Sequence, residues 1–440
     1  MVEQGSDAQA AAEVATRRHG DLVRSSVWLS GGSAAVSLTG FISWALVSSR
    51  VDPSTVGRAA ALFSLTLLLV YLTAAGLPMA VAHYCRGRDL ASGVAFSWAC
   101  VLTVGTSCGG ALVLVAVGPE SVQPLIEGLS VPGAFLAMSA VVAGLSLSSG
   151  LDLRITATRR RAWGAVSWLV AGLVRLPVLL LLPVTSGAAL LWLAITGSLA
   201  VRGPAAIVAL RTSVGPLRLR PVPERWRSML DYTGVNAVSQ LVEEAPFILL
   251  PVLVLSVVTP ATNAAFYVAW SFSMGVFILL RMISNSLLVE GALSGEELRH
   301  QTRFAMLISF GCAALATLLS LPGAVLIVAA FGSAYQEGAD VLPVLTGASF
   351  FGAISATLLG EARVRHDRMP VVVIPLVLGV VTLGLAAATI DQRGLAGVAM
   401  AWFVGHGSAA LAAVLLRMRA VRRGRGSPLL FRSLARLPSV

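Results

Sequence analysis

Long apolar stretches separated by short polar segments occupy almost the whole of the 440-residue chain. An α-helix needs about 20 apolar residues to cross a hydrocarbon core about 30 Å thick. By that measure the pattern predicts twelve spanning helices, whose ends are set to within about four residues. They cover residues 26–48, 56–84, 91–117, 131–151, 162–183, 187–210, 228–258, 261–289, 304–331, 341–359, 369–389 and 395–416. The chain is therefore expected to be an all-α integral membrane protein.

Composition agrees with this class. Hydrophobic residues make up 56% of the chain and charged residues only 12%, against about 25% charged in a soluble domain. The net charge of +11 is compatible with nucleic-acid binding, but the charge is divided among short segments between the apolar stretches. We therefore interpret it as a topology signal and expect no nucleic-acid partner.

The arginines set the orientation, and they supply all 32 basic residues of the chain. With a cytoplasmic N-terminus, 26 of them fall in cytoplasmic segments and three lie within helices. Only Arg50, Arg58 and Arg393 then face the outside. Because basic residues are retained on the cytoplasmic side, both termini are predicted to be cytoplasmic, in a multi-pass protein of a bacterial plasma membrane.

A short internal repeat divides the chain into two halves. Val51 begins the sequence VDPST and Val258 begins VTPAT, 207 residues later, each directly after a predicted helix. Six helices per half give parallel repeats about an axis along the membrane normal. The expected parts are a cytoplasmic tail (1–25), a six-helix lobe (26–210), a cytoplasmic loop (211–227), a second six-helix lobe (228–416) and a basic cytoplasmic tail (417–440).

Five charged residues lie well inside predicted helices, where each costs about 2.5–3.5 kcal/mol if it faces lipid. They are expected to face the protein interior or a wet cavity instead. These residues are Arg175, Arg202, Glu243, Glu244 and Arg281.

The two glutamates belong to a polar face of helix 228–258. Asn236, Gln240 and Glu243 fall on one side of that helix, and Glu244 lies at its edge. Two adjacent carboxylates in a medium of low dielectric constant do not both ionise easily, so one is expected to bind and release protons. We predict an ion-coupling role for Glu243 and Glu244. The alternative is a structural ion pair with Arg175 or Arg281.

The three intramembrane arginines favour an anionic ligand, because a guanidinium stays charged and matches phosphate oxygens in a bidentate fork. Polar side chains at similar depth are expected to assist them. The predicted substrate-binding residues are Arg175, Arg202, Arg281, Asn236, Gln240 and Asn285.

Enzyme signals are missing from the sequence. It contains no HExxH, no phosphate-binding loop, no GxSxG and no paired Cys or His motif. We therefore expect a protein that is not an enzyme and that holds neither a metal nor a cofactor.

Three stretches resemble the polysaccharide (Wzx-type) flippases of the multidrug/oligosaccharidyl-lipid/polysaccharide exporter superfamily. They are VDPSTVGRAAALFSLTLLLVYLTAAGLPMAVAHY from Val51, AAFYVAWSFSMGVFILLRMISNSLLVEGA from Ala264 and FGSAYQEGADVLPVL from Phe331. The resemblance covers roughly residues 25–416. It implies two six-helix lobes around a central cavity, and transport by alternating access.

The resemblance also implies a substrate. It would be a polyprenyl-pyrophosphate-linked oligosaccharide that is moved from the inner to the outer leaflet, with membrane lipids and the polysaccharide polymerase machinery as further candidate partners. One alternative is a multidrug cation/proton antiporter of the same superfamily, although three intramembrane arginines disfavour a cationic substrate. Another is a polyprenyl-dependent glycosyltransferase or polymerase, which needs catalytic acids in a sizeable outer loop. The outer loops hold only scattered acids: Asp52, Glu120, Glu127, Glu337, Asp340 and Asp391.

Overall fold

The structure is a computed structural model that describes ten stretches of the chain. They are residues 31, 35, 38–74, 90–117, 130–157, 161–183, 185–209, 223–289, 295–365 and 367–422. Within them the chain is helical and contains no strand. Eight of the helices are long and apolar enough to cross a membrane. The predicted all-α membrane fold is confirmed.

The first half of the chain forms one group of helices, which we call the N-lobe. Here α5 packs against α4 and α7, α6 packs against α7, and α2 contacts α4, α5 and α7. The helices are Leu38–Ser48, α2 (Pro53–Ala74), α4 (Leu90–Val117), α5 (Val131–Ala157), α6 (Arg161–Leu181) and α7 (Ala188–Ala209).

The second half forms the C-lobe, in which α14 packs against α9, α12 and α13. Its elements are α9 (Pro223–Val257), α10 (Pro260–Val289), α11 (Gly295–Phe331), η2 (Ser333–Tyr335), α12 (Gln336–Gly347), α13 (Ser349–Val364) and α14 (Arg368–Arg422). The predicted helix 341–359 is divided between α12 and α13 at Ala348. The last two predicted helices follow each other within α14. They are separated by Gly394, whose φ of +51° ends the helical conformation.

The internal repeat marks two equivalent helix starts. At α2 the Asp52 carboxylate accepts hydrogen bonds from the backbone N–H groups of Ser54 (3.0 Å) and Thr55 (3.2 Å). At α10 the Thr259 hydroxyl accepts one from the Thr262 N–H, also at 3.2 Å. In both helices proline is the first helical residue, where its missing N–H has no intrahelical partner to lose. The repeated V-x-P-x-T thus encodes a capped helix N-terminus.

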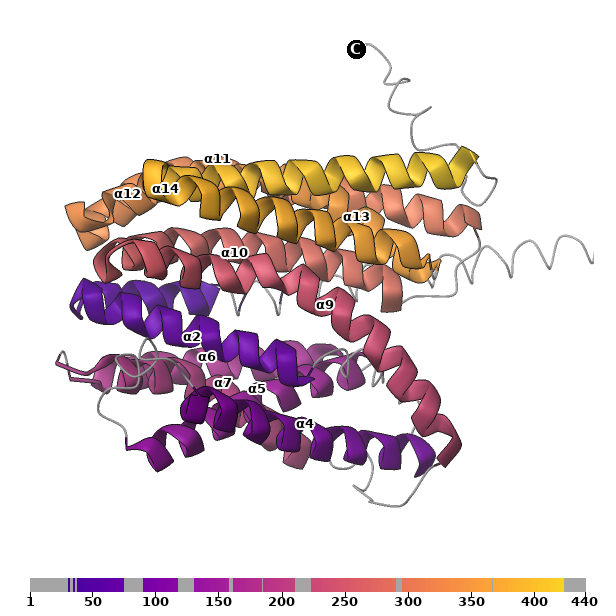
Figure 1. The fold of residues 1–440 in the computed structure, drawn as a ribbon, viewed down its shortest axis with the longest axis horizontal. Coiled ribbons are helices and arrows are strands. Elements are labelled where there is room, and N and C mark those ends of the chain that lie inside the picture. Colours follow the sequence, from indigo (N-terminus) through magenta and orange to yellow (C-terminus); the bar gives the residue numbers. More distant parts are fainter. Residues whose placement is uncertain are drawn as a thin grey trace, which may run out of the picture.

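The lobes meet along α2, which packs against α9 and α10 of the C-lobe (Figure 1). Near the starts of α2 and α10 the Asn263 side chain donates a hydrogen bond of 3.1 Å to the Gly57 carbonyl. Next to it, the Trp44 ring lies 4.7 Å from that of Tyr267. An edge-to-face aromatic contact and a side chain–backbone hydrogen bond therefore hold the lobes together at the end of the molecule that is predicted to face outward.

Some expectations fall outside the described residues. The tail 1–25, residues 211–222 of the loop between the lobes and residues 423–440 are among them. The helix α14 continues to Arg422, so the first residues assigned to the basic tail are helical. The remaining limits of the lobes, the orientation and the bacterial membrane stay predictions.

Candidate functional site

The two adjacent glutamates of α9 reach two different helices. Glu244 forms an ion pair with Arg281 on α10, and Glu243 forms one with Arg363 on α13. Consecutive residues on a helix point about 100° apart, which is why neighbouring carboxylates contact separate partners. The side chain of Glu244 is 6% exposed and that of Glu243 is 14% exposed. The four side chains form a partly buried network, which we call the glutamate–arginine cluster.

One member of this cluster connects the lobes. Arg281 contacts Glu244 within the C-lobe and also lies near enough to the Tyr71 hydroxyl, on α2 of the N-lobe, to interact with it electrostatically. Its guanidinium carbon also lies 5.5 Å from the centre of the Phe247 ring. A change in the charge of Glu244 would therefore act on a side chain that is shared between the two halves of the molecule.

Next to the cluster, the C-lobe contains a small cavity of about 40 Å³, lined among others by Glu243, Arg281 and His406. His406 is 2% exposed, and its ring stacks on Phe277 at 4.4 Å and contacts Trp402 at 4.2 Å. Neither ring nitrogen has a hydrogen-bond partner among the described residues. A cavity of this size is large enough for a water molecule.

Arg202 lies in the N-lobe, apart from this cluster. Its Nη1 donates a 3.0 Å hydrogen bond to Asp152 of α5, its Nη2 pairs with the other oxygen of the same carboxylate, and its Nε donates one of 3.0 Å to Ser167 of α6. The guanidinium also stacks on the Trp168 ring at 3.8 Å. Trp168 in turn donates a 2.8 Å hydrogen bond to Asp152. Arg202 thus joins α5, α6 and α7.

Arg175 has different surroundings. It is 3% exposed on α6, one turn after Gly172, whose backbone lies against Thr39 of the first helix. No hydrogen bond or ion pair involves Arg175 within the described part of the chain, and its Nε atom is buried without a partner. It is a buried cation without a neighbouring carboxylate in the described ranges.

The predicted substrate-binding residues therefore do not form one group. Arg281 is paired with Glu244, Arg202 with Asp152, and Arg175 lies by itself. Gln240 is partly buried one turn before the glutamates, while the side chains of Asn236 and Asn285 lie outside the described ones. The roles assigned to these residues stay predictions.

Sequence reasoning missed three members of these networks. Arg363 was counted only as a cytoplasmic topology charge, although it is the partner of Glu243. Asp152 stands at the end of a predicted helix, and its spacing to Arg202 carries no signal because the two lie on different helices. Tyr71 looks like an ordinary aromatic residue of an apolar helix. Among the described residues, no group of His, Cys, Asp and Glu is placed to bind a metal.

Comparison with known proteins gives the fold of the chain. No family model and no curated protein matches it. Solved structures match with high similarity of fold and low identity. An inward-facing multidrug resistance MATE family transporter of the MOP superfamily has a TM-score of 0.66 at 15% identity, over 89% of this chain and 96% of that one. The outward-facing conformation has a TM-score of 0.65 at 14% identity, over 92% and 96%.

A third structure is a MOP superfamily transporter from Pyrococcus furiosus, described as having a binding pocket of reverse polarity. Its TM-score is 0.62 at 14% identity, over 91% of this chain and 96% of that one. All three are described as transporters. The chain has the fold of the MATE transporters of the MOP superfamily, with two lobes of six helices.

Proposed function

We propose that this chain is a membrane transporter that moves an anionic, lipid-linked substrate by alternating access between its two lobes. The substrate that we infer is a polyprenyl-pyrophosphate-linked oligosaccharide, carried from the inner to the outer leaflet for cell-surface polysaccharide assembly. The fold supports transport. The single observation that favours an anionic substrate is Arg175, which is 3% exposed and has no carboxylate beside it among the described residues.

The ion pairs of the other arginines agree with this sign. Among the described residues, Arg202 is paired with Asp152, Arg281 with Glu244 and Arg363 with Glu243. Arg175 is the buried arginine for which the described residues supply no carboxylate. A buried charge without a partner is expensive, and a pyrophosphate would supply the missing negative charge. Arg175 is accordingly the residue that we assign to the substrate.

Ion coupling is assigned to the glutamate–arginine cluster. Protonation of Glu244 removes its attraction to Arg281, which also lies within electrostatic reach of Tyr71 of the other lobe. The strength of the contact between α2 and α10 then depends on whether Glu244 is protonated. In this way a proton gradient can change the populations of two conformations, which is all that transport of an intact lipid requires.

The second candidate is a multidrug cation/proton antiporter. The observation in its favour is the pair of partly buried carboxylates in the C-lobe, in a fold shared with multidrug resistance transporters. A cationic substrate would have to displace Arg281 or Arg363 from these carboxylates. The ion pairs therefore favour the anionic substrate.

The first test uses purified protein in liposomes that contain a polyprenyl-pyrophosphate oligosaccharide. Arg175→Gln should weaken substrate binding roughly ten- to a hundredfold, because a hydrogen bond to a charged group contributes about 1.5–3 kcal/mol. Arg175→Lys should rescue part of it, since lysine keeps the charge without the planar fork. The matched control is Arg393→Gln, which removes an exposed arginine. Unchanged binding in Arg175→Gln, together with proton-coupled export of organic cations, would place the antiporter first.

The second test addresses coupling in the same liposomes. Glu243→Gln or Glu244→Gln should reduce transport and flatten its dependence on a pH gradient, with the amount of inserted protein unchanged. If both single variants and the double variant keep full, gradient-dependent transport, the carboxylates only connect α9 to α10 and α13.

A further inference from the structure

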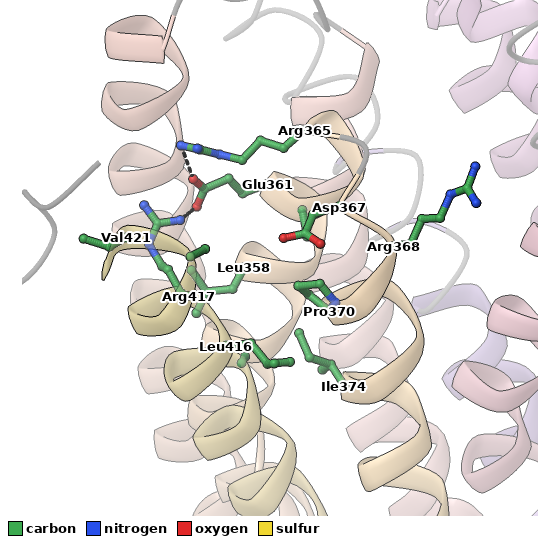
Figure 2. A pocket seen from close by; sticks show the side chains of 13 residues that line it. Leu358, Glu361, Arg365, Asp367, Arg368, Pro370, Ile374, Leu416, Arg417 and Val421 are labelled. Atoms are coloured by element: carbon green, nitrogen blue, oxygen red, sulfur yellow. Dashed lines mark ion pairs between the residues drawn. The ribbon is translucent and has the colours of Figure 1, made fainter. Parts of the chain in front are cut away.

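A larger pocket lies in the C-lobe where α13 ends and where α14 both begins and finishes. Its volume is about 400 Å³. Figure 2 shows the side chains that line it, which come from the last turns of α13, the turn after it and both ends of α14. This end of the lobe is predicted to face the cytoplasm. None of the substrate-binding or coupling residues assigned above lines it.

The pocket is amphipathic. Its charged end lies on the side predicted to face the cytoplasm, and its apolar end lies toward the predicted membrane interior. Figure 2 shows the charged side chains at one end and Leu416 and Ile374 at the other, farther along the helices toward the middle of the lobe. Leu358 and Ala413 are among the other apolar residues of the lining. A headgroup in the charged part would thus leave its glycerol and acyl chains next to apolar side chains. A soluble ion would gain nothing from that surface.

On one side of the pocket the charge is positive. Glu361 is 1% exposed and its carboxylate is shared by two arginines, Arg365 at 2.8 Å and Arg417. A third arginine, Arg299 of α11, lies close enough to repel Arg417. Among the described residues, Glu361 is the only ion-pair partner of Arg417, and the contact is made by Nη1. The remaining donors of Arg417 are available to an anion.

On the other side the charge is negative. The Asp367 carboxylate lies across the pocket from Arg417 (Figure 2). No ion pair joins it to any described side chain, although Arg365 is near enough to attract it electrostatically. Arg368, the next residue, points away from the other charges in the same view. The pocket therefore offers a cation and an anion to the same ligand.

A ligand that matches both charges carries a phosphate and a protonated amine. We propose that this pocket binds an inner-leaflet phospholipid with an ethanolamine-type headgroup, whose phosphate contacts Arg417 and whose ammonium group contacts Asp367. An anionic phospholipid would leave Asp367 without a partner, and a quaternary ammonium lacks the N–H groups that a carboxylate accepts. The site is independent of the transported substrate.

The experiment measures lipid retention by the full-length protein, exchanged into nanodiscs of phosphatidylethanolamine, phosphatidylglycerol and phosphatidylcholine in equal parts and then released for native mass spectrometry. We expect the wild type to retain phosphatidylethanolamine at least about fivefold over either competitor. Asp367→Asn should abolish that preference while phospholipid is still retained. Arg417→Gln should reduce retention of all three lipids. Arg368→Gln is the matched control and should behave as the wild type.

Each result decides the proposal. Equal retention of the three lipids by the wild type, or a preference that Asp367→Asn leaves intact, would overturn it. Free phosphoethanolamine distinguishes a lipid from a soluble ligand. It should fail to displace bound lipid at concentrations at which dispersed phosphatidylethanolamine succeeds, and equal displacement would show that the apolar part of the pocket is not used. Melting temperatures identify any variant that is misfolded, and for Arg417 the conservative Arg417→Lys should then restore retention in part.

Discussion

Each guanidinium nitrogen of Arg202 has a partner in its own lobe, which gives this residue a structural role that its depth in the membrane does not reveal. Asp152 and Ser167 accept its hydrogen bonds, and Trp168 covers its face. Arg175, at similar depth, has none of these contacts. Two arginines at similar predicted depth thus differ in whether a described side chain compensates their charge, and this difference is why we assign Arg175 to the substrate.

The ion pair between Asp152 and Arg202 leads to a prediction about stability. Asp152→Ala should lower the free energy of unfolding by about 3–5 kcal/mol, because it leaves Arg202 buried without a counter-charge. The double variant Asp152→Leu with Arg202→Met should recover much of this loss, since both charges are then removed. Thermal unfolding in detergent measures both. An unchanged melting temperature for Asp152→Ala would show that solvent or another group compensates Arg202.

At the scale of elements, the contact between α2 and α10 depends on a single glycine. A Cβ atom added at Gly57 would lie 2.0 Å from the Pro260 carbonyl oxygen, so no side chain fits. The Gly57 carbonyl also accepts the Asn263 hydrogen bond. The helices that begin the two halves of the chain can approach this closely only because the residue between them has no side chain.

Gly57→Ala should therefore separate the ends of α2 and α10 and lower the melting temperature. The matched control is Gly105→Ala on α4, where an added Cβ meets nothing within 4 Å. That variant should be neutral or stabilising by up to about 1 kcal/mol, as alanine favours a helix over glycine. Equal behaviour of the two variants would mean that the close crossing of α2 and α10 does not contribute to stability.

The N-terminus of α2 gives a pH prediction. The hydrogen bond that the Ser54 hydroxyl donates lowers the pKa of Asp52 below its ordinary value, so the charged carboxylate stabilises the folded state. That contribution is present above the pKa of unfolded aspartate, about 3.9, and is lost as the pH falls through the lowered value. Asp52→Ala should cost about 1 kcal/mol at pH 7. The difference between its melting curve and that of the wild type should shrink below about pH 4, and a difference that persists at pH 2 would contradict the argument.

At the scale of the whole molecule, the orientation rests on the distribution of arginine and can be tested directly. After replacement of the native cysteines, Arg220→Cys and Arg368→Cys should be shielded from an impermeant thiol reagent in intact cells. Glu337→Cys and Asp391→Cys should be labelled, because they stand in segments predicted to face outward. If the first pair is labelled and the second pair is protected, the orientation is opposite to the predicted one, and so is the proposed direction of transport.

The amino-acid sequence by itself determined the class of fold and the equivalent starts of the two halves. Both are local properties: the length of an apolar stretch decides whether a helix can cross a bilayer, and a cap followed by proline decides where a helix begins. The break between α12 and α13 already belongs to packing and backbone geometry, because it divides the predicted helix 341–359, whose apolar pattern is continuous. The turn at Gly394, in contrast, falls in the gap between the predicted helices 369–389 and 395–416.

Only the tertiary structure decided which charges compensate one another. Glu243 and Arg363 are 120 residues apart, as Asp152 and Arg202 are 50 residues apart, and no local pattern specifies such pairs. Which side chains meet depends on how helices from distant parts of the chain pack against one another. A charge deep in a helix signals only that a partner or a cavity must exist. Arg175 has no such partner among the described residues, and this could be seen only after the other arginines had been placed with theirs.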